Sequence, residues 1–335
     1  MFVRNSTSLD VILARGHVSD EIAVAAVVVS QVLRIEDGSL APLAEPPPPS
    51  EHDSPDITRF ALWEGVSVTA AGTAVGPAAA PFVCPVRFRV GAAERRLIVF
   101  GERRWERRLG GAIEATPAAR FDRVELSFAR AFGGAYDLPP GLLPGTDLPH
   151  PGLRVSYPLN ANGVGFYPDE HAAVGSPLPS IERPDQLVRR WNDQPEPAGF
   201  TPCRDLVAWR MKDEAAARAQ QPEPAQALPF TLPTLRIQHH APPWLIFDDV
   251  PVGTPIELHG LRASPLRFLV PPSPATVTVR APGTRVDAAL RPRLRALHVD
   301  AKQRAARLVY DHHFRYDPRR APSWVRVADA PRGAP

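Results

Sequence analysis

The stretch IAVAAVVVSQVLRI, residues 22–35, decides how the rest of this sequence is interpreted. It is rich in β-branched residues, and neither glycine nor proline interrupts it. β-Branched side chains favour an extended backbone, where they pack well on a pleated surface. The stretch therefore predicts a long, buried β-strand.

Other segments show the alternation expected of half-buried strands. Over residues 82–90, the apolar side chains fall on one face and Arg87 and Arg89 on the other. Further strands are predicted over residues 66–70, 95–100, 121–128, 256–261, 266–270, 276–280, 294–299 and 308–316. Many short strands joined by proline- and glycine-rich turns indicate a mainly β protein with an antiparallel, sandwich-like architecture.

Proline sets the limits on helix. The 335 residues include 41 prolines, against an average usage of about 5%. Because proline removes a donor and clashes inside a helix, long helices are excluded over most of the chain. Only two short helices are predicted, over residues 184–191 and 205–220, both in a Pro/Gly-rich, partly helical middle region.

These patterns divide the chain into three consecutive parts. An N-terminal β part covers residues 1–135, the irregular middle region covers 136–233, and a C-terminal β part covers 234–330. A chain of this length can form either one large β domain or two domains. We predict one compact domain overall.

Charge and cysteine content exclude several classes of protein. The net charge is only +3, and the arginines are spread among acidic residues, so no nucleic-acid partner is predicted. Two cysteines are too few for a disulfide scaffold. With no apolar run of about 18 residues and no signal-peptide pattern at the start, we expect a cytoplasmic protein without membrane insertion.

The usual catalytic signatures are absent from the sequence. It contains no GxSxG elbow, no P-loop and no HExxH motif, so we predict no catalytic, cofactor-binding or metal-binding residues. The pairs His239-His240 and His312-His313 would point to opposite faces of a strand, which argues against a shared metal. An enzyme that uses a carboxylate pair such as Asp137 and Asp169 is a less favoured alternative.

The distinctive feature is a series of short motifs rich in glycine and aromatic residues. In order, they are VFGERRW (99–105), RAFGG (130–134), GVGF (163–166), LPSIE (178–182) and PEPAGF (195–200). Glycine permits sharp bends, and an aromatic ring can pack beneath the bend. The motifs are therefore typical of structural corners as well as of binding loops.

These motifs, in this order, resemble the bacterial domain-of-unknown-function family 2169 (DUF2169), and the resemblance covers nearly the whole chain. It implies a non-catalytic adaptor or chaperone that binds a secreted effector of a type VI secretion system and helps to load it onto the VgrG/PAAR spike. A structural component of a larger bacterial assembly is the alternative. The residues nominated as the family-motif cluster are Arg103, Arg104, Trp105, Phe132, Gly134, Gly165 and Phe166.

Overall fold

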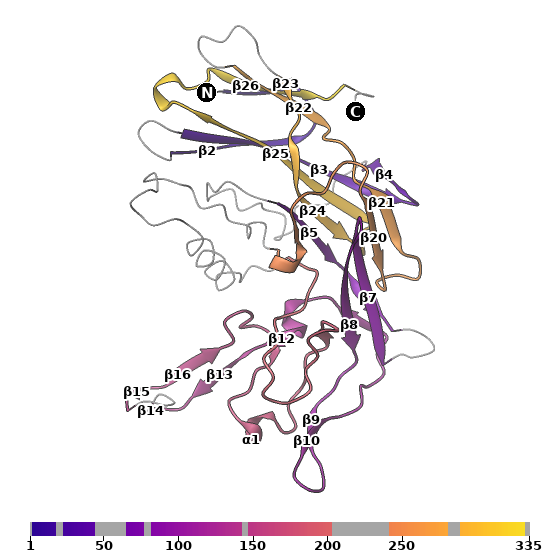
Figure 1. The fold of residues 1–335 in the computed structure, drawn as a ribbon, viewed down its shortest axis with the longest axis vertical. Helices are drawn as coiled ribbons and strands as arrows, with labels where there is room; N and C mark the ends of the chain where they lie inside the picture. Colours follow the sequence, from indigo (N-terminus) through magenta and orange to yellow (C-terminus); the bar gives the residue numbers. More distant parts are fainter. Residues whose placement is uncertain are drawn as a thin grey trace. The chain divides into compact units, whose positions relative to one another are not determined.

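The computed structural model describes residues 2–17, 23–43, 65–76, 82–142, 147–202, 241–280 and 289–331, and the chain there is mainly β with mostly antiparallel sheets (Figure 1). Within those ranges the one α-helix is α1, Glu170–Ala173. The predicted fold class is confirmed, whereas a partly helical middle region is not.

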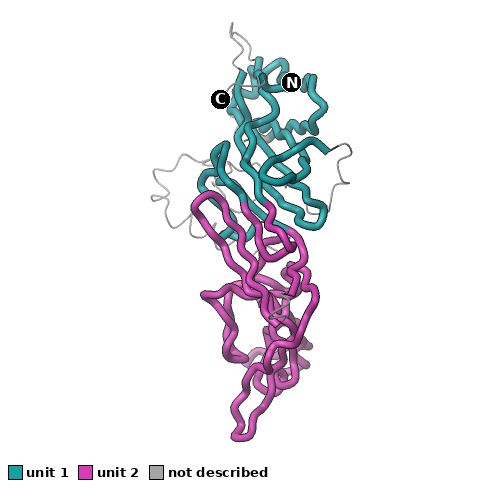
Figure 2. The backbone as a smooth tube through the Cα atoms, turned by 90° about the vertical axis from the view of Figure 1, so that its right-hand side faces the viewer, with its two compact units in different colours: residues 1–70, 209–256, 267–335 teal, residues 71–208, 257–266 magenta. Residues whose placement is uncertain are grey.

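The chain divides into two compact units, coloured separately in Figure 2. Unit 1 contains residues 1–70, 209–256 and 267–335, and unit 2 contains residues 71–208 and 257–266. Both units therefore combine segments that are distant in sequence. Unit 1 is discontinuous because strands from the beginning of the chain pair with strands near its end.

The predicted long strand is the organising element of unit 1. It is β3, Ala23–Glu36, and it pairs antiparallel with β25, Ala305–Tyr316, along the whole of β25. The sheet has the order β19-β5-β24-β25-β3-β2, and β4 also pairs with β3. The remaining strands are β2 (Asp10–His17), β4 (Ser39–Pro42), β5 (Val66–Ala71), β19 (Ile246–Phe247) and β24 (Arg293–Asp300).

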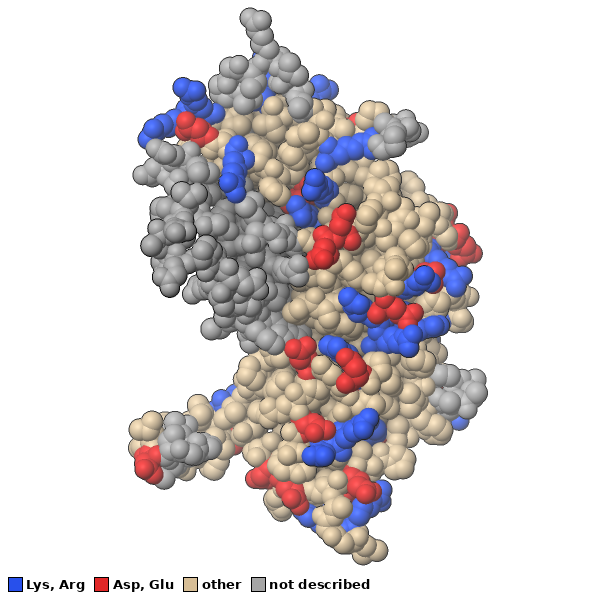
Figure 3. Space-filling model, in the orientation of Figure 1, with Lys and Arg blue, Asp and Glu red and all other residues tan. Residues whose placement is uncertain are grey.

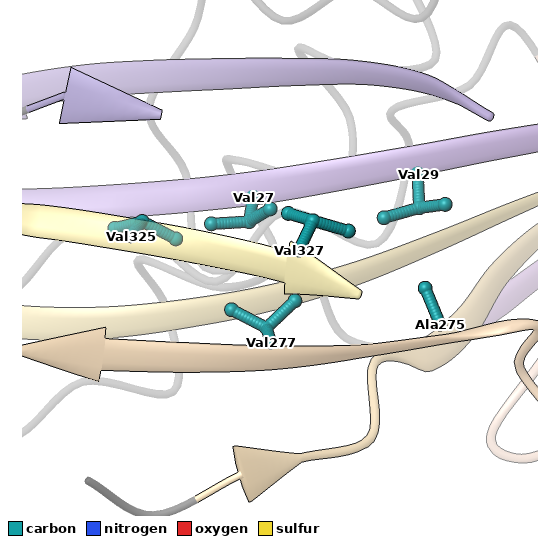
Figure 4. Close-up of a cluster of buried hydrophobic side chains, with 6 residues drawn as sticks. All are labelled: Val27, Val29, Ala275, Val277, Val325 and Val327. Atoms are coloured by element: carbon teal, nitrogen blue, oxygen red, sulfur yellow. The ribbon is translucent and has the colours of Figure 1, made fainter. Parts of the chain in front are cut away.

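A smaller sheet packs against this one. Its order is β1-β26-β22-β23, with β1 (Phe2–Asn5) parallel to β26 (Trp324–Asp329), and β22 (Ala275–Arg280) and β23 (Ala289–Leu290) completing it. Val27 and Val29 of β3 share a buried cluster with side chains of β22 and β26 (Figure 4). Apolar faces of two sheets therefore meet across one core, as in a sandwich.

A third large sheet has the order β18-β8-β7-β20-β21. Its strands are β7 (Val83–Val90), β8 (Ala93–Phe100), β18 (Ile181–Glu182), β20 (Pro255–His259) and β21 (Leu266–Leu269). The predicted alternation in β7 is confirmed, since Val86 and Phe88 are buried while Arg87 and Arg89 are exposed. The turn into β8 contains Gly91 at φ +59°.

Short strand pairs make up much of the remainder of unit 2. They are β9 (Trp105–Arg107) with β10 (Ile113–Ala115), β11 (Arg123–Glu125) with β6 (Thr73–Val75), β12 (Phe132–Gly133) with β17 (Val164–Gly165), β13 (Ala135–Leu138) with β16 (Leu153–Ser156), and β14 (Gly141–Leu142) with β15 (Pro149–His150). The strand predicted over 121–128 is shorter than expected, because the chain turns into the 3-10 helix Phe128–Arg130, capped by Ser127.

The helix predicted over residues 184–191 does not form. Three of its backbone N–H groups bond to acidic side chains instead of to carbonyls one turn back: Val188 N donates to the Glu182 carboxylate at 2.8 Å, and Arg189 N and Arg190 N both donate to Asp193 Oδ2 at 2.8 Å. Such side-chain acceptors compete with helix formation. The helix predicted over 205–220, Cys203 and the pair His239-His240 lie outside the described residues.

Candidate functional site

The sequence motifs come together in unit 2 through backbone hydrogen bonds. Leu178 N donates to Arg103 O at 3.0 Å, and Ser180 N donates to Arg130 O at 2.8 Å. β12 and β17 pair in parallel, with Gly133 opposite Gly165. Four of the motifs, separated by many residues in sequence, are thus held together as one backbone framework, and the nominated residues all lie in it or on it.

The glycines of this framework sit where no side chain fits. Gly133 has φ +150°, and a Cβ there would lie 2.1 Å from the backbone oxygen of Asn160. Gly134 at φ +123° and Gly165 at φ +112° also adopt conformations that favour glycine. The buried Asn160 side chain donates to Phe128 O at 2.7 Å and to Phe132 O at 3.0 Å, which fixes the loop against the glycines.

We expect Gly133→Ala to destabilise the protein by more than Gly175→Ala. Gly175 also has a positive φ, +80°, but nothing lies within 4 Å of its Cβ position. The control therefore carries only the conformational cost, about 1–2 kcal/mol, while Gly133→Ala adds overpacking of about 1–3 kcal/mol. Urea denaturation of both variants measures the difference, and equal losses would show that the close approach to Asn160 relaxes freely.

Aromatic side chains from the motifs form the core beneath the framework. Trp105 and Phe132 are buried together with Tyr157 and Leu178, and Phe166 packs against them. The Phe132 and Tyr157 rings meet edge to face at 4.9 Å between centroids, and Tyr157 and Phe166 lie 5.5 Å apart. Trp105 and Phe132 are therefore core residues, and Phe166 is partly buried beside them.

Arg103 and Glu182 form a buried ion pair in the same framework. Their side chains are 9% and 2% exposed, and Arg103 Nη2 donates both to the Glu182 carboxylate and to Pro179 O. The guanidinium carbon lies 3.8 Å from the centre of the Phe100 ring, which favours a cation. Burial raises the pKa of Glu182 above its usual range, and the charge of Arg103 opposes that rise.

Arg104 differs from Arg103 because its side chain is exposed. Its Nη1 donates to Gly175 O at 3.0 Å. Arg130, at the end of the 3-10 helix, is exposed as well. Both arginines border a surface pocket of about 360 Å³, which we call the arginine pocket; among its lining residues are Glu102, Arg103, Arg104, Arg130, Val164 and Leu178.

Other groups considered from the sequence occupy separate places. Asp137 lies 3.5 Å from Arg154 on the surface, and Asp169 caps α1 by accepting a hydrogen bond from Ala172 N at 2.8 Å. His312 stacks on Phe314, while His313 lies 3.8 Å from Asp311. Among the described residues, no group of three or more His, Cys, Asp or Glu side chains is placed to hold a metal ion.

Unit 1 contains a larger pocket without any nominated residue. Its volume is about 590 Å³, and Asp248, Arg291, Arg293 and Tyr310 are among the lining residues. Arg295, also in the lining, is bound through Nε to the buried Asp311 at 2.6 Å. No sequence pattern pointed to this pocket, since its lining comes from five separate segments.

Sequence reasoning also missed Asn160, Glu182 and Arg130 as individual residues. Glu182 and Arg130 lie in the quoted motifs, but nothing in the sequence marked Glu182 as the partner of Arg103. Asn160 stands in a turn-like stretch, where asparagine is common for local reasons. A single amino-acid sequence does not reveal that a polar residue in a loop is buried.

The fold and this framework define a mainly β protein in which short glycine- and aromatic-rich motifs, distant in sequence, are joined by backbone hydrogen bonds. Residues 21–311 match the profile of the family described as "Uncharacterized protein conserved in bacteria (DUF2169)". The chain belongs to this family. Searches of curated proteins and of solved structures found no match.

A bilayer-spanning helix would need about 20 apolar residues. In the part of the chain that the structure describes, no helix has the length and apolar character to cross a membrane.

Proposed function

We propose that this protein is a non-catalytic adaptor of the bacterial cytosol, which binds a type VI secretion effector and helps to load it onto the VgrG/PAAR spike. Membership of the DUF2169 family supports the proposal, because the resemblance noted above associates that family with effector loading. The proposed partners are the effector and the spike components.

The observation that carries the proposal is that some motif residues are buried in the framework while others are exposed beside a pocket. Trp105, Phe132 and the glycines hold a framework, whereas Arg104 and Arg130 remain exposed beside a pocket on it. Arginine is among the residue types enriched at binding hot spots. A fixed scaffold that presents arginines at a pocket suits reversible recognition of another protein.

A structural role in a larger assembly is the second candidate. Several large apolar side chains are exposed, among them Phe2 at 78% and Leu109 at the tip of the β9–β10 hairpin. Apolar side chains exposed in this way become buried in permanent interfaces. An adaptor is needed for secretion of its cargo, whereas a structural component is needed for the assembly itself. This difference distinguishes the two candidate functions.

The decisive experiment deletes the gene in its host and follows secretion. For an adaptor, we expect the culture supernatant to lose one effector while the VgrG spike is still released. Affinity capture with the tagged chain should retain that effector or a PAAR protein, and a tag-only control should not. Continued secretion of every effector would overturn the proposal, and simultaneous loss of the spike would favour the structural role.

A further inference from the structure

The arginine pocket combines a fixed backbone with exposed positive charge. Arg130 N donates to Ser127 O at 3.0 Å and Arg130 O accepts from Ser180 N at 2.8 Å, so the backbone that carries this side chain is held on both sides. Arg104 forms an isolated antiparallel bridge with Pro177. The two exposed guanidinium groups therefore project from anchored positions, which lowers the entropic cost of binding.

The charges that line the pocket do not balance. The charge of Arg103 is compensated by Glu182 beneath it. Arg104 and Arg130 then face one carboxylate of the lining, that of Glu102. The Arg104 guanidinium bonds a neutral carbonyl, and the Arg130 guanidinium has no hydrogen-bond or ion-pair partner among the residues described. A small excess of positive charge remains open to a ligand.

The dimensions and lining suit a short stretch of polypeptide. A volume of about 360 Å³ lies at the lower end of typical ligand pockets. Val164 and Leu178 supply apolar lining beside the arginines. Arginine forms paired hydrogen bonds with planar carboxylates. An acidic group flanked by aliphatic side chains therefore matches both parts of the lining.

A nucleic-acid phosphate is the less suitable anion. Recognition of a phosphate backbone uses an extended track of basic residues. On the face drawn in Figure 3, basic and acidic side chains are interspersed instead of forming such a track.

We propose that the arginine pocket binds a carboxylate of a partner polypeptide, with Arg130 as the principal cation, Arg104 as the second and Glu102 as the residue that limits affinity. The inference rests on the proposed protein-binding function and names the chemistry recognised at that site. The carboxylate belongs either to an internal Asp or Glu side chain or to a chain terminus.

Titration of short peptides into the full-length chain, followed by NMR, tests the site directly. The probes are acetyl-Ala-Val-Glu-Val-Ala-amide, the corresponding glutamine peptide with a free carboxy-terminus, and the glutamine peptide with both ends blocked. We expect the first or the second to bind and the third to bind at least tenfold more weakly, because a hydrogen bond to a charged group contributes about 1.5–3 kcal/mol. Which of the first two binds identifies the source of the carboxylate.

Two variants should change this affinity in opposite directions. Arg130→Ala is expected to weaken binding about tenfold or more, and Glu102→Gln is expected to strengthen it about two- to fivefold, the effect of removing one exposed like charge. Arg154→Ala is the matched control, since Arg154 is an exposed arginine of unit 2 that is not among the residues lining the pocket. Urea denaturation checks that each variant remains folded.

The possible results separate this inference from the proposed function. Absence of saturable binding by either carboxylate peptide, equal effects of Arg130→Ala and Arg154→Ala, or binding of inorganic phosphate or a thymidine oligonucleotide alone would overturn the pocket assignment. If Arg130→Glu still restores effector secretion in the deletion strain, the pocket is not the cargo site although the adaptor function stands. If even the wild-type chain has no effect on secretion, the adaptor function itself fails.

Discussion

Replacing Arg103 by methionine is expected to lower the free energy of unfolding by about 3–5 kcal/mol, the typical cost of removing one partner from a buried ion pair. The variant leaves the Glu182 carboxylate, 2% exposed, without its cation. The backbone N–H of Val188 remains one hydrogen-bond donor to it. Urea denaturation at neutral pH, compared with the wild-type chain, measures the loss.

The loss in the Arg103→Met variant should shrink as the pH falls. Burial raises the pKa of Glu182, and the variant removes the positive charge that opposes this rise. The pKa of this carboxyl in the folded state then lies above its unfolded value of about 4.3, so the folded protein binds the proton more tightly. As the pH is lowered through the folded-state pKa towards about 4.3, the folded form takes up the proton first, and the variant therefore gains stability. The variant should lie closer to wild type at pH 5 than at pH 7.5.

A double variant distinguishes loss of the pair from simple loss of packing. In Arg103→Met/Glu182→Leu no charge is left buried, so we expect a smaller destabilisation than in Arg103→Met alone. Some cost remains, because Val188 N loses its acceptor. A double variant less stable than Arg103→Met, or a penalty independent of pH, would contradict the assignment of Glu182 as a buried carboxylate that depends on Arg103.

The sequence predicted the fold best where local pattern and tertiary packing agree. The β-branched run of residues 22–35 and the alternating residues 82–90 correspond to the strands β3 and β7. Such patterns indicate directly whether one or both faces of a strand are buried. The helix over 184–191 failed for a reason that no periodicity shows. Backbone N–H groups in this stretch donate hydrogen bonds to the carboxylates of Glu182 and Asp193, and the geometry of those contacts depends on the tertiary fold.

The site was predictable only in part, for a related reason. The motifs rich in glycine and aromatic residues indicated the framework. Glycine is needed where two backbone segments approach closely, and an aromatic ring packs beneath them, so both residue types recur together in the sequence. Nothing in the sequence distinguished Arg103 from its neighbour Arg104, although one is buried and paired while the other is exposed. That difference arises from which face of the chain meets Glu182, a residue that lies in another motif.

Truncating Trp105 to alanine should be about as damaging as Arg103→Met, the other large loss predicted in unit 2. Its side chain is 1% exposed, and it packs in the cluster that includes Phe132, Tyr157 and Leu178. Truncation of a large buried aromatic residue costs about 3–5 kcal/mol. That is a large part of the whole stability of a typical protein, about 5–15 kcal/mol. Thermal and urea unfolding of the full chain measure the loss.

Leu109 provides the matched control for this prediction, because it lies at the tip of the same hairpin and is fully exposed. Leu109→Ala should change stability by no more than about 0.5 kcal/mol. Trp105→Phe should lie between the two, since it keeps an aromatic ring but leaves a smaller cavity. If Trp105→Ala instead unfolds with wild-type stability and only effector binding is lost, Trp105 belongs to the binding surface and not to the core. A graded loss of stability across the three variants would show that Trp105 acts as a core residue beneath the VFGERRW motif (99–105).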